Sequence, residues 1–322
     1  MNLRIKGTGS FLPATTFSND DIAKLVDTND EWIRERTGIG TRRLSTGEDV
    51  AFMAAKACEN ALEMAGVDAK EVELLIVATC SPEVSIPCVA CQVQAEVGAE
   101  NAVAFDLNAA CSGFLFALNT VYAYMQAGIY KNALVVGAEG LSKLVDWSDR
   151  GTCILFGDGA GAAYVEADQK AGEPYRFVQH AIGAKGKVLQ CVGRDIQNPV
   201  YTADETSKYI TMDGGEVFKF AVGKIPACIN ELFSRTEITA DDVDYFILHQ
   251  ANLRIITSIA KKLGQDMSKF PSNLECVGNM SSASIPVLLD DCNRKGMFQE
   301  GMRLVMSGFG AGLTYSAAMI TW

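Results

Sequence analysis

Short aliphatic runs alternate with amphipathic stretches along this chain of 322 residues. Runs such as residues 72–77, 134–136 and 304–306 are mostly apolar at successive positions, which is typical of strands covered on both faces of a sheet. Other stretches repeat apolar residues at helical spacing, as in Phe114, Leu115, Leu118, Val121 and Tyr122. The alternation of these two patterns predicts a layered α/β fold.

Several of these segments recur in the same order at an offset of about 170 residues. Such internal similarity is typical of a duplicated fold. We therefore predict an N-terminal half over residues 1–170, which carries a candidate nucleophile, and a C-terminal half over residues 171–322. The matching pairs are 58–62 with 228–232, 72–77 with 243–248, 134–136 with 304–306, and the helix after Cys111 with the helix after Ser281.

Charge and composition narrow the classes of function. The chain has 28 lysines and arginines against 39 acidic residues, a formal charge of −11. Nonspecific nucleic-acid binding needs a basic surface, so this class is excluded. Apolar runs are too short for a membrane span and the first residues follow a strand pattern, so we expect no membrane association and a cytoplasmic location.

Ten cysteines are scattered through the chain, as in a reducing compartment. Only Cys88 and Cys91 form a CxxC pair. Because no second pair and no histidine lies near it, helix packing is favoured over zinc or redox chemistry.

Three segments contain the candidate chemistry. Cys111 opens a helix of small residues, where unpaired N–H groups and the helix dipole favour a thiolate. His249 follows the strand-like residues 244–248, and Asn279 lies between Gly278 and Met280. Taken singly, Cys111 would be interpreted as a core thiol and Asn279 as a turn residue, while His249 would fit a buried structural histidine as well as a catalytic one. Together they predict a Cys-His-Asn active site.

Two glycine-rich segments have different interpretations. Residues 157–162 fit a loose G-x-G-x-x-A pattern, but a strand pattern follows them, whereas a dinucleotide site needs a helix there. Residues 308–312 predict a tight turn that brings backbone N–H groups of Gly310 and Ala311 close to a ligand.

Ordered motifs over nearly the whole length resemble the thiolase-fold condensing enzymes, and among them the β-ketoacyl-(acyl carrier protein) synthase III family. The resemblance implies a thiolase-like fold with two pseudo-symmetric halves in α/β/α/β/α layers, and a homodimer. The motifs that carry it are residues 7–13, 30–39, 149–152, 156–160, 216–219, 249–254, 278–286 and the terminal glycine turn.

The resemblance also implies a reaction. An acyl-CoA would acylate Cys111 and release CoA, and malonyl-acyl carrier protein would then lose CO₂ and condense with the acyl group. His249 and Asn279 would donate hydrogen bonds to the enolate oxygen, while N–H groups of Cys111 and the turn near Ala311 would stabilise the tetrahedral intermediates. These steps imply no metal and no cofactor, since the CoA thioester is a substrate.

Binding residues follow from the same resemblance. Ile86 is implied near the dimer interface, where many relatives have phenylalanine, and its smaller side chain would admit a longer or branched primer in the partner subunit. The remaining residues are Trp32, Arg36 and Arg150 for CoA, Lys219, Arg254, Lys261 and Lys262 for carrier docking, and Phe156, Met212 and Phe309 for the acyl pocket.

Other functions stay open at this point. An acyltransferase to oxygen or nitrogen acceptors, or a ketosynthase of specialised metabolism, would use the same acyl-cysteine. The presence of both His249 and Asn279 favours condensation. A papain-like hydrolase lacks support because its local cysteine signature is absent. A noncatalytic partner subunit could dispense with Cys111, which this chain has.

Overall fold

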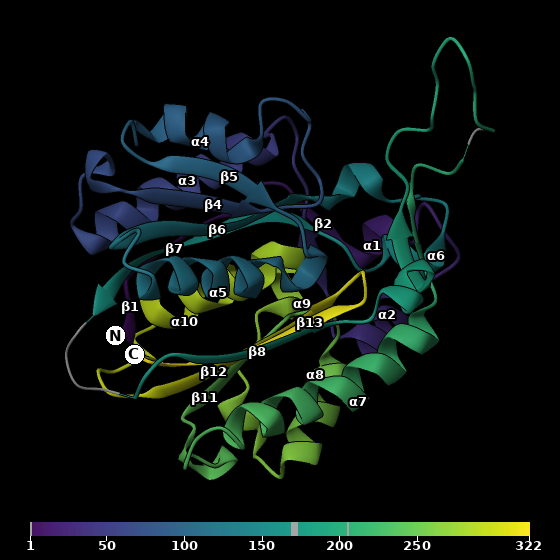
Figure 1. Ribbon diagram of the computed structural model, residues 1–322. Coiled ribbons are helices and arrows are strands. Elements are labelled where there is room, and N and C mark those ends of the chain that lie inside the picture. Colours follow the sequence, from purple (N-terminus) through teal and green to yellow (C-terminus); the bar gives the residue numbers. More distant parts are fainter. Residues whose placement is uncertain (1, 169–172, 205) are drawn as a thin grey trace.

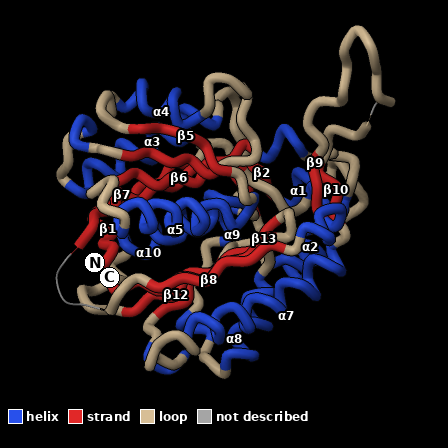
Figure 2. Tube along the Cα trace, viewed as in Figure 1, coloured by secondary structure: helices blue, strands red, loops and turns tan. Residues whose placement is uncertain are grey.

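The computed structural model of the protein describes residues 2–168, 173–204 and 206–322. Its main elements form five layers, in which two sheets enclose a pair of helices and each sheet has two more helices outside it (Figures 1 and 2). This is the α/β/α/β/α arrangement predicted above. From one outer layer to the other they are α3 (Val50–Ala65) and α4 (Val89–Val97); β1 (Asn2–Phe11), β7 (Asp158–Asp168), β6 (Asn132–Gly140), β4 (Leu74–Ala78) and β5 (Val103–Leu107); α5 (Gly113–Gln126) and α10 (Ser284–Arg294); β8 (Arg176–Ala181), β13 (Thr314–Thr321), β12 (Arg303–Gly310) and β11 (Tyr245–Leu248); and α7 (Gly214–Phe233) and α8 (Leu253–Leu263).

The two sheets have the same strand order. The first runs β1-β7-β6-β4-β5 and the second runs β8-β13-β12-β11, so that only β5 is extra. In the first sheet the pairs β1/β7 and β7/β6 are antiparallel and β6/β4 is parallel. In the second sheet the corresponding pairs β8/β13 and β13/β12 are antiparallel and β12/β11 is parallel. This correspondence supports the proposed duplication. The proposed boundary between residues 170 and 171 lies outside the described residues.

Three apolar clusters hold the five layers together. Phe114 and Leu118 of α5 and Ile285 and Leu288 of α10 are buried between the sheets, against strands of both. Separate clusters bury α3 and α4 on the first sheet and α7 and α8 on the second. Because the middle helices are covered on two sides by sheet, they present apolar residues around much of their circumference, whereas α8 exposes a polar face.

Shorter elements lie around one end of the layers. Two of them, β9 (Leu189–Cys191) and β10 (Ile210–Met212), supply residues to the cavity described below. Figure 2 shows where these two strands lie. In the described part of the chain, no helix combines the length and the apolar character needed to cross a bilayer. The other short elements are β2 (Thr16–Ser18), α1 (Asn19–Ile22), α2 (Asp30–Thr37), β3 (Thr41–Arg43), α6 (Arg150–Cys153) and α9 (Leu274–Val277).

Two turns at the starts of the middle helices fix the position of the site. A short 3₁₀ turn over Ala110–Ser112 precedes α5, and one over Ser281–Ala283 precedes α10. Ala110 and Ser281 have positive φ angles of 48° and 46°, which non-glycine residues seldom adopt. Residues held in this conformation need support from their surroundings, and here each turn packs against the other half of the chain.

Candidate active site

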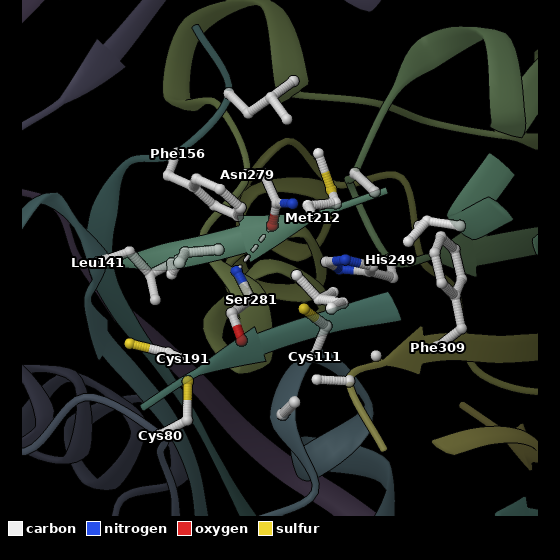
Figure 3. A pocket seen from close by; sticks show the side chains of 18 of the residues that line it. Cys80, Cys111, Leu141, Phe156, Cys191, Met212, His249, Asn279, Ser281 and Phe309 are labelled. Atoms are coloured by element: carbon white, nitrogen blue, oxygen red, sulfur yellow. Dashed lines mark hydrogen bonds between the residues drawn. The ribbon is translucent and has the colours of Figure 1, made fainter. Parts of the chain in front are cut away.

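A cavity of about 400 Å³ contains the three candidate catalytic residues. Figure 3 shows Cys111, His249 and Asn279 around the same space, although they come from three separate segments of the chain. Gly310 and Ala311 of the β12–β13 turn also line it. The apolar part of the wall includes Phe156, Met212 and Phe309, which the sequence placed in an acyl pocket, together with Leu141, Leu144, Leu155, Leu189 and Ile210.

Cys111 lies in the 3₁₀ turn that leads directly into α5. Its surroundings are so close that a Cβ on Gly310 would stand only 2.5 Å from the backbone nitrogen of Cys111. Burial raises the pKa of the Cys111 thiol to about 12, although a hydrogen bond with the Ser281 side chain lowers it and the charge of Glu139 raises it further. The direction of this shift is opposite to the stabilised thiolate that the sequence argument predicted from the helix terminus, because burial disfavours the charged form.

His249 follows the last residue of β11, as the sequence predicted, and its backbone N–H donates to Ser307 O at 2.8 Å. Its ring is buried, and Nδ1 lies 2.6 Å from Oγ of Ser284. Burial lowers the pKa of His249 to about 3, so the ring is neutral at physiological pH. With Nδ1 occupied by a hydroxyl group, Nε2 is the ring nitrogen left for a ligand in the cavity.

Asn279 is held in an extended segment by two backbone bonds. Its N–H donates to Leu155 O at 2.9 Å and its C=O accepts from Gly157 N at 3.0 Å. The side-chain oxygen Oδ1 accepts from the backbone N–H of Ser281 at 2.9 Å, the bond drawn in Figure 3. Because this bond uses the amide oxygen, the amide NH₂ group is left to donate into the cavity.

The candidate CoA residues form a cluster of their own outside the cavity wall. The guanidinium carbons of Arg36 and Arg150 lie 4.9 and 4.8 Å from the centre of the Trp32 ring. Arg150 also donates to Asp27 O at 3.0 Å. Trp32 packs on the apolar cluster that includes Phe156, so this cationic-aromatic group adjoins the wall of the cavity. The structure therefore brings together the three residues that the family resemblance assigned to CoA.

The candidate docking residues follow α7 and α8 near the opening. Lys219 adjoins Phe218, a cavity residue, and forms an exposed ion pair with Glu216 at 3.0 Å. The Arg254 guanidinium lies 6.0 Å from the ring of Phe218. Lys261 and Lys262 are in the last turn of α8, and Nζ of Lys262 donates to Val222 O at 2.8 Å. Lys219 and Arg254 thus lie close to the cavity residue Phe218, and Lys261 and Lys262 extend the basic row along α8.

Ile86 differs from the other acyl-pocket candidates. It is 88% exposed and does not line the cavity of its own chain. Its role was predicted for the pocket of a partner subunit, and it stays a prediction.

Sequence reasoning missed five residues that surround the reacting groups. Cys80 and Cys191 line the cavity, Ser281 and Ser284 hold Asn279 and His249, and Glu139 is buried behind Ser281. Only Glu139 has a local signal, since an acidic residue at the end of an aliphatic run is unusual. Within the described ranges, no group of three or more His, Cys, Asp or Glu side chains could hold a metal ion.

Comparisons with known proteins give matches along the whole chain. Residues 105–186 match the family model for 3-oxoacyl-(acyl-carrier-protein) synthase III, and residues 233–322 match the model for its C-terminal part. A β-ketoacyl-(acyl-carrier-protein) synthase III from Clostridium novyi (strain NT) is 45% identical over 100% of this chain and 99% of its own length.

Solved structures extend the likeness to the fold. The crystal structure of 3-oxoacyl-(acyl-carrier-protein) synthase III from Aquifex aeolicus VF5 has a TM-score of 0.94 at 38% identity, with both chains covered completely. The priming β-ketosynthase of the R1128 polyketide biosynthetic pathway has a TM-score of 0.91 at 34% identity, with 99% of this chain and 96% of that chain covered. These similarities confirm the predicted thiolase-like fold class.

Proposed function

The chain belongs to the β-ketoacyl-(acyl-carrier-protein) synthase III family, and from this premise we propose that Cys111, His249 and Asn279 carry out its two half-reactions. Family membership makes the protein an acyltransferase, the condensing enzyme that initiates type II fatty-acid synthesis. The observation that supports the roles best is the arrangement of donors. His249 and Asn279 each have one polar atom fixed by the protein and one left for the cavity that holds the Cys111 sulfur.

In the first half-reaction, the Cys111 sulfur attacks the thioester carbonyl of an acyl-CoA. A new carbon–sulfur bond forms, the bond to the CoA sulfur breaks, and the thiol proton is lost to solvent or to the departing thiolate. Gly310 supports this step because only a residue without Cβ allows the β12–β13 turn to approach Cys111 so closely. We assign the oxyanion contacts to the N–H groups of Cys111 and of the turn near Ala311.

In the second half-reaction, malonyl-acyl carrier protein loses CO₂ and the electron pair moves onto its thioester oxygen as an enolate. The enolate carbon then attacks the acyl-Cys111 carbonyl, and the sulfur of Cys111 leaves. Nε2–H of His249 and the NH₂ group of Asn279 would donate to the enolate oxygen. The neutral ring donates from Nε2 in the tautomer whose Nδ1 accepts a hydrogen bond from the Ser284 hydroxyl group.

The binding partners belong to the same proposal. Acyl-CoA would place its nucleotide on the Trp32 cluster, and the carrier protein would approach the basic row of Lys219, Arg254, Lys261 and Lys262. A local basic surface on a chain with a charge of −11 would steer an acidic partner to the opening.

Assembly, location and cofactor use complete the proposal. A homodimer is proposed from the family alone. We propose a cytoplasmic location, with support from ten free cysteines, all among the described residues. The two half-reactions need no metal or redox cofactor.

Intact-protein mass spectrometry tests the roles directly. The enzyme is incubated with a panel of acyl-CoAs, and malonyl-acyl carrier protein is then added. We expect an adduct that Cys111→Ala lacks and that disappears as β-ketoacyl-carrier protein and CO₂ appear. His249→Ala and Asn279→Ala should form the adduct but discharge it slowly. No adduct with any acyl-CoA would contradict the nucleophile, and an adduct that malonyl-carrier protein cannot discharge would indicate an acyltransferase.

A ketosynthase of specialised metabolism is the second candidate, because a priming β-ketosynthase from a polyketide pathway shares the fold at 34% identity. The same acyl-CoA panel separates the two. If the enzyme prefers primers used in fatty-acid synthesis and the malonyl-loaded fatty-acid carrier protein discharges the acyl adduct, the result supports the condensing enzyme of fatty-acid synthesis. Discharge only by a dedicated carrier protein supports the second.

A further inference from the structure

Glu139 is a fully buried carboxylate at the end of β6, between the two halves of the chain. Oε1 lies 2.9 Å from Oγ of Ser281 and 2.8 Å from Oγ of Ser282, while Oε2 accepts from Oγ of Ser81 and from the N–H of Cys80 at 3.1 Å. No ion pair to Glu139 is formed within the described ranges. The carboxylate is therefore stabilised by hydroxyl and N–H donors, which it holds in fixed places.

The donor that matters for chemistry is Ser281. Its φ of 46° is sparsely populated for serine, and its hydroxyl group donates to Glu139. The backbone N–H of the same residue donates to Oδ1 of Asn279. A single residue thus connects the buried carboxylate to the amide whose NH₂ group lines the cavity. Release of the Ser281 hydroxyl would free the turn, and the amide would lose the bond that sets its orientation.

We propose that Glu139 is a positioning residue for Asn279, acting through the Ser281 turn. This inference rests on the proposed function, in which Asn279 donates to the enolate oxygen. Since Asn279 serves decarboxylation and condensation, and not the attack of Cys111 on acyl-CoA, loss of the Glu139 carboxylate should slow the second half-reaction. It should not slow the first, because the charge of Glu139 raises the pKa of Cys111. A general loss of stability would slow both half-reactions.

Glu139→Gln tests the proposal, because it keeps the shape of the side chain but replaces an acceptor oxygen by a donor. Asp290→Asn is the matched control. Asp290 is also a buried carboxylate that binds two hydroxyl groups, those of Thr8 at 2.9 Å and Ser10 at 2.6 Å. Unlike Glu139 it also pairs with Arg294, at 2.9 Å, and none of these partners lines the cavity. Each half-reaction is timed separately, by adduct formation from acyl-CoA and by discharge of pre-acylated enzyme with malonyl-carrier protein.

We expect Glu139→Gln to acylate within about threefold of the wild type and to discharge about ten- to a hundredfold more slowly, a misplaced donor costing somewhat less than an absent one. Asp290→Asn should not separate the two rates. Equal slowing of both half-reactions in Glu139→Gln, or no slowing, would overturn the proposal. If that variant does not fold, Ser281→Ala removes the connecting hydroxyl group and must slow discharge by a similar factor. Discharge is measured on pre-acylated enzyme, in which the hydrogen bond of Ser281 to the free Cys111 thiol plays no part.

A crystal structure keeps this inference distinct from the proposed function. In Glu139→Gln we expect Oδ1 of Asn279 to lose its bond to the Ser281 N–H. An unchanged turn and amide would overturn the positioning role whatever the activity. A wild-type enzyme that no acyl-CoA acylates would contradict the proposed function instead, while the crystallographic result would still decide the role of Glu139.

Discussion

Replacement of Gly310 by alanine should disable the first half-reaction. A Cβ at this position would stand 2.5 Å from the backbone nitrogen of Cys111, 3.1 Å from Cβ of Ala110 and 3.2 Å from Cα of Cys111. The first contact involves backbone atoms, so no side-chain rotation relieves it. Either the β12–β13 turn or the Cys111 turn has to move.

The size of that movement follows from ordinary contact distances. Since unstrained contacts begin at about 3.4 Å, the two segments must separate by about 0.9 Å. A misplacement of about 1 Å at reacting groups can cost on the order of a hundredfold in rate. The forced repacking should also cost about 1 to 3 kcal/mol of stability. We therefore expect acylation of Cys111 to slow about a hundredfold in a protein that still folds.

The assay is a quenched-flow measurement of the acyl adduct at saturating acyl-CoA, with a thermal unfolding curve for each variant. Gly308→Ala and Gly183→Ala provide a graded control. A Cβ at Gly308 would first meet the flexible Cδ1 of Ile285 at 3.2 Å, and one at Gly183 would meet nothing within 4 Å. The expected order of rates is wild type and Gly183→Ala, then Gly308→Ala, then Gly310→Ala. Acylation of Gly310→Ala at about the wild-type rate would refute the steric reasoning.

Three further predictions follow from the site. Because burial raises the pKa of Cys111 to about 12, the thiolate is the minor form at neutral pH. The rate of acylation, followed by stopped flow, should therefore rise about tenfold per pH unit from about pH 6 to pH 9. A rate that does not change with pH would contradict this. Ser284→Ala removes the hydrogen-bond partner of His249 Nδ1 and should slow discharge of pre-acylated enzyme about tenfold without slowing acylation. Ser284→Thr keeps a hydroxyl group and should restore the rate of discharge. Equal slowing of discharge in both variants would contradict a role of the hydroxyl group in orienting His249. Lys261→Glu, in the last turn of α8, should raise the KM for malonyl-carrier protein several-fold at low salt and leave the KM for acyl-CoA unchanged; a salt-independent effect would count against electrostatic docking.

Local patterns were sufficient to predict the layers and the ends of the elements that carry the site. The aliphatic run before His249 is β11, and the small residues around Cys111 are the turn before α5. Both predictions succeeded because a buried strand and an apolar helix leave a signal within a few neighbouring residues.

Properties that depend on distant contacts were not predictable in the same way. The pKa of Cys111 was expected to fall because only the helix terminus was visible in the sequence, whereas burial by distant segments dominates it. Glu139 binds Ser281 across 142 positions of sequence, and Ser284 binds His249 across 35. No spacing rule joins residues so far apart, so the groups that orient the candidate donors appeared only with the structure.

The duplicated fold explains why these distant contacts are needed. The strand register aligns Leu134 with Val305, one residue away from the sequence pairing of 134–136 with 304–306. At this offset of 171 residues Glu139 corresponds to Gly310, and each packs against the turn of the opposite half. On one side the carboxylate binds the Ser281 turn and orients Asn279; on the other, the absence of a side chain lets β12 reach the backbone of Cys111. Equivalent turns have thus acquired opposite requirements, hydrogen bonding in one case and close approach in the other. A side chain introduced at position 310 should therefore slow acylation of Cys111, and removal of the side chain at position 139 should slow condensation.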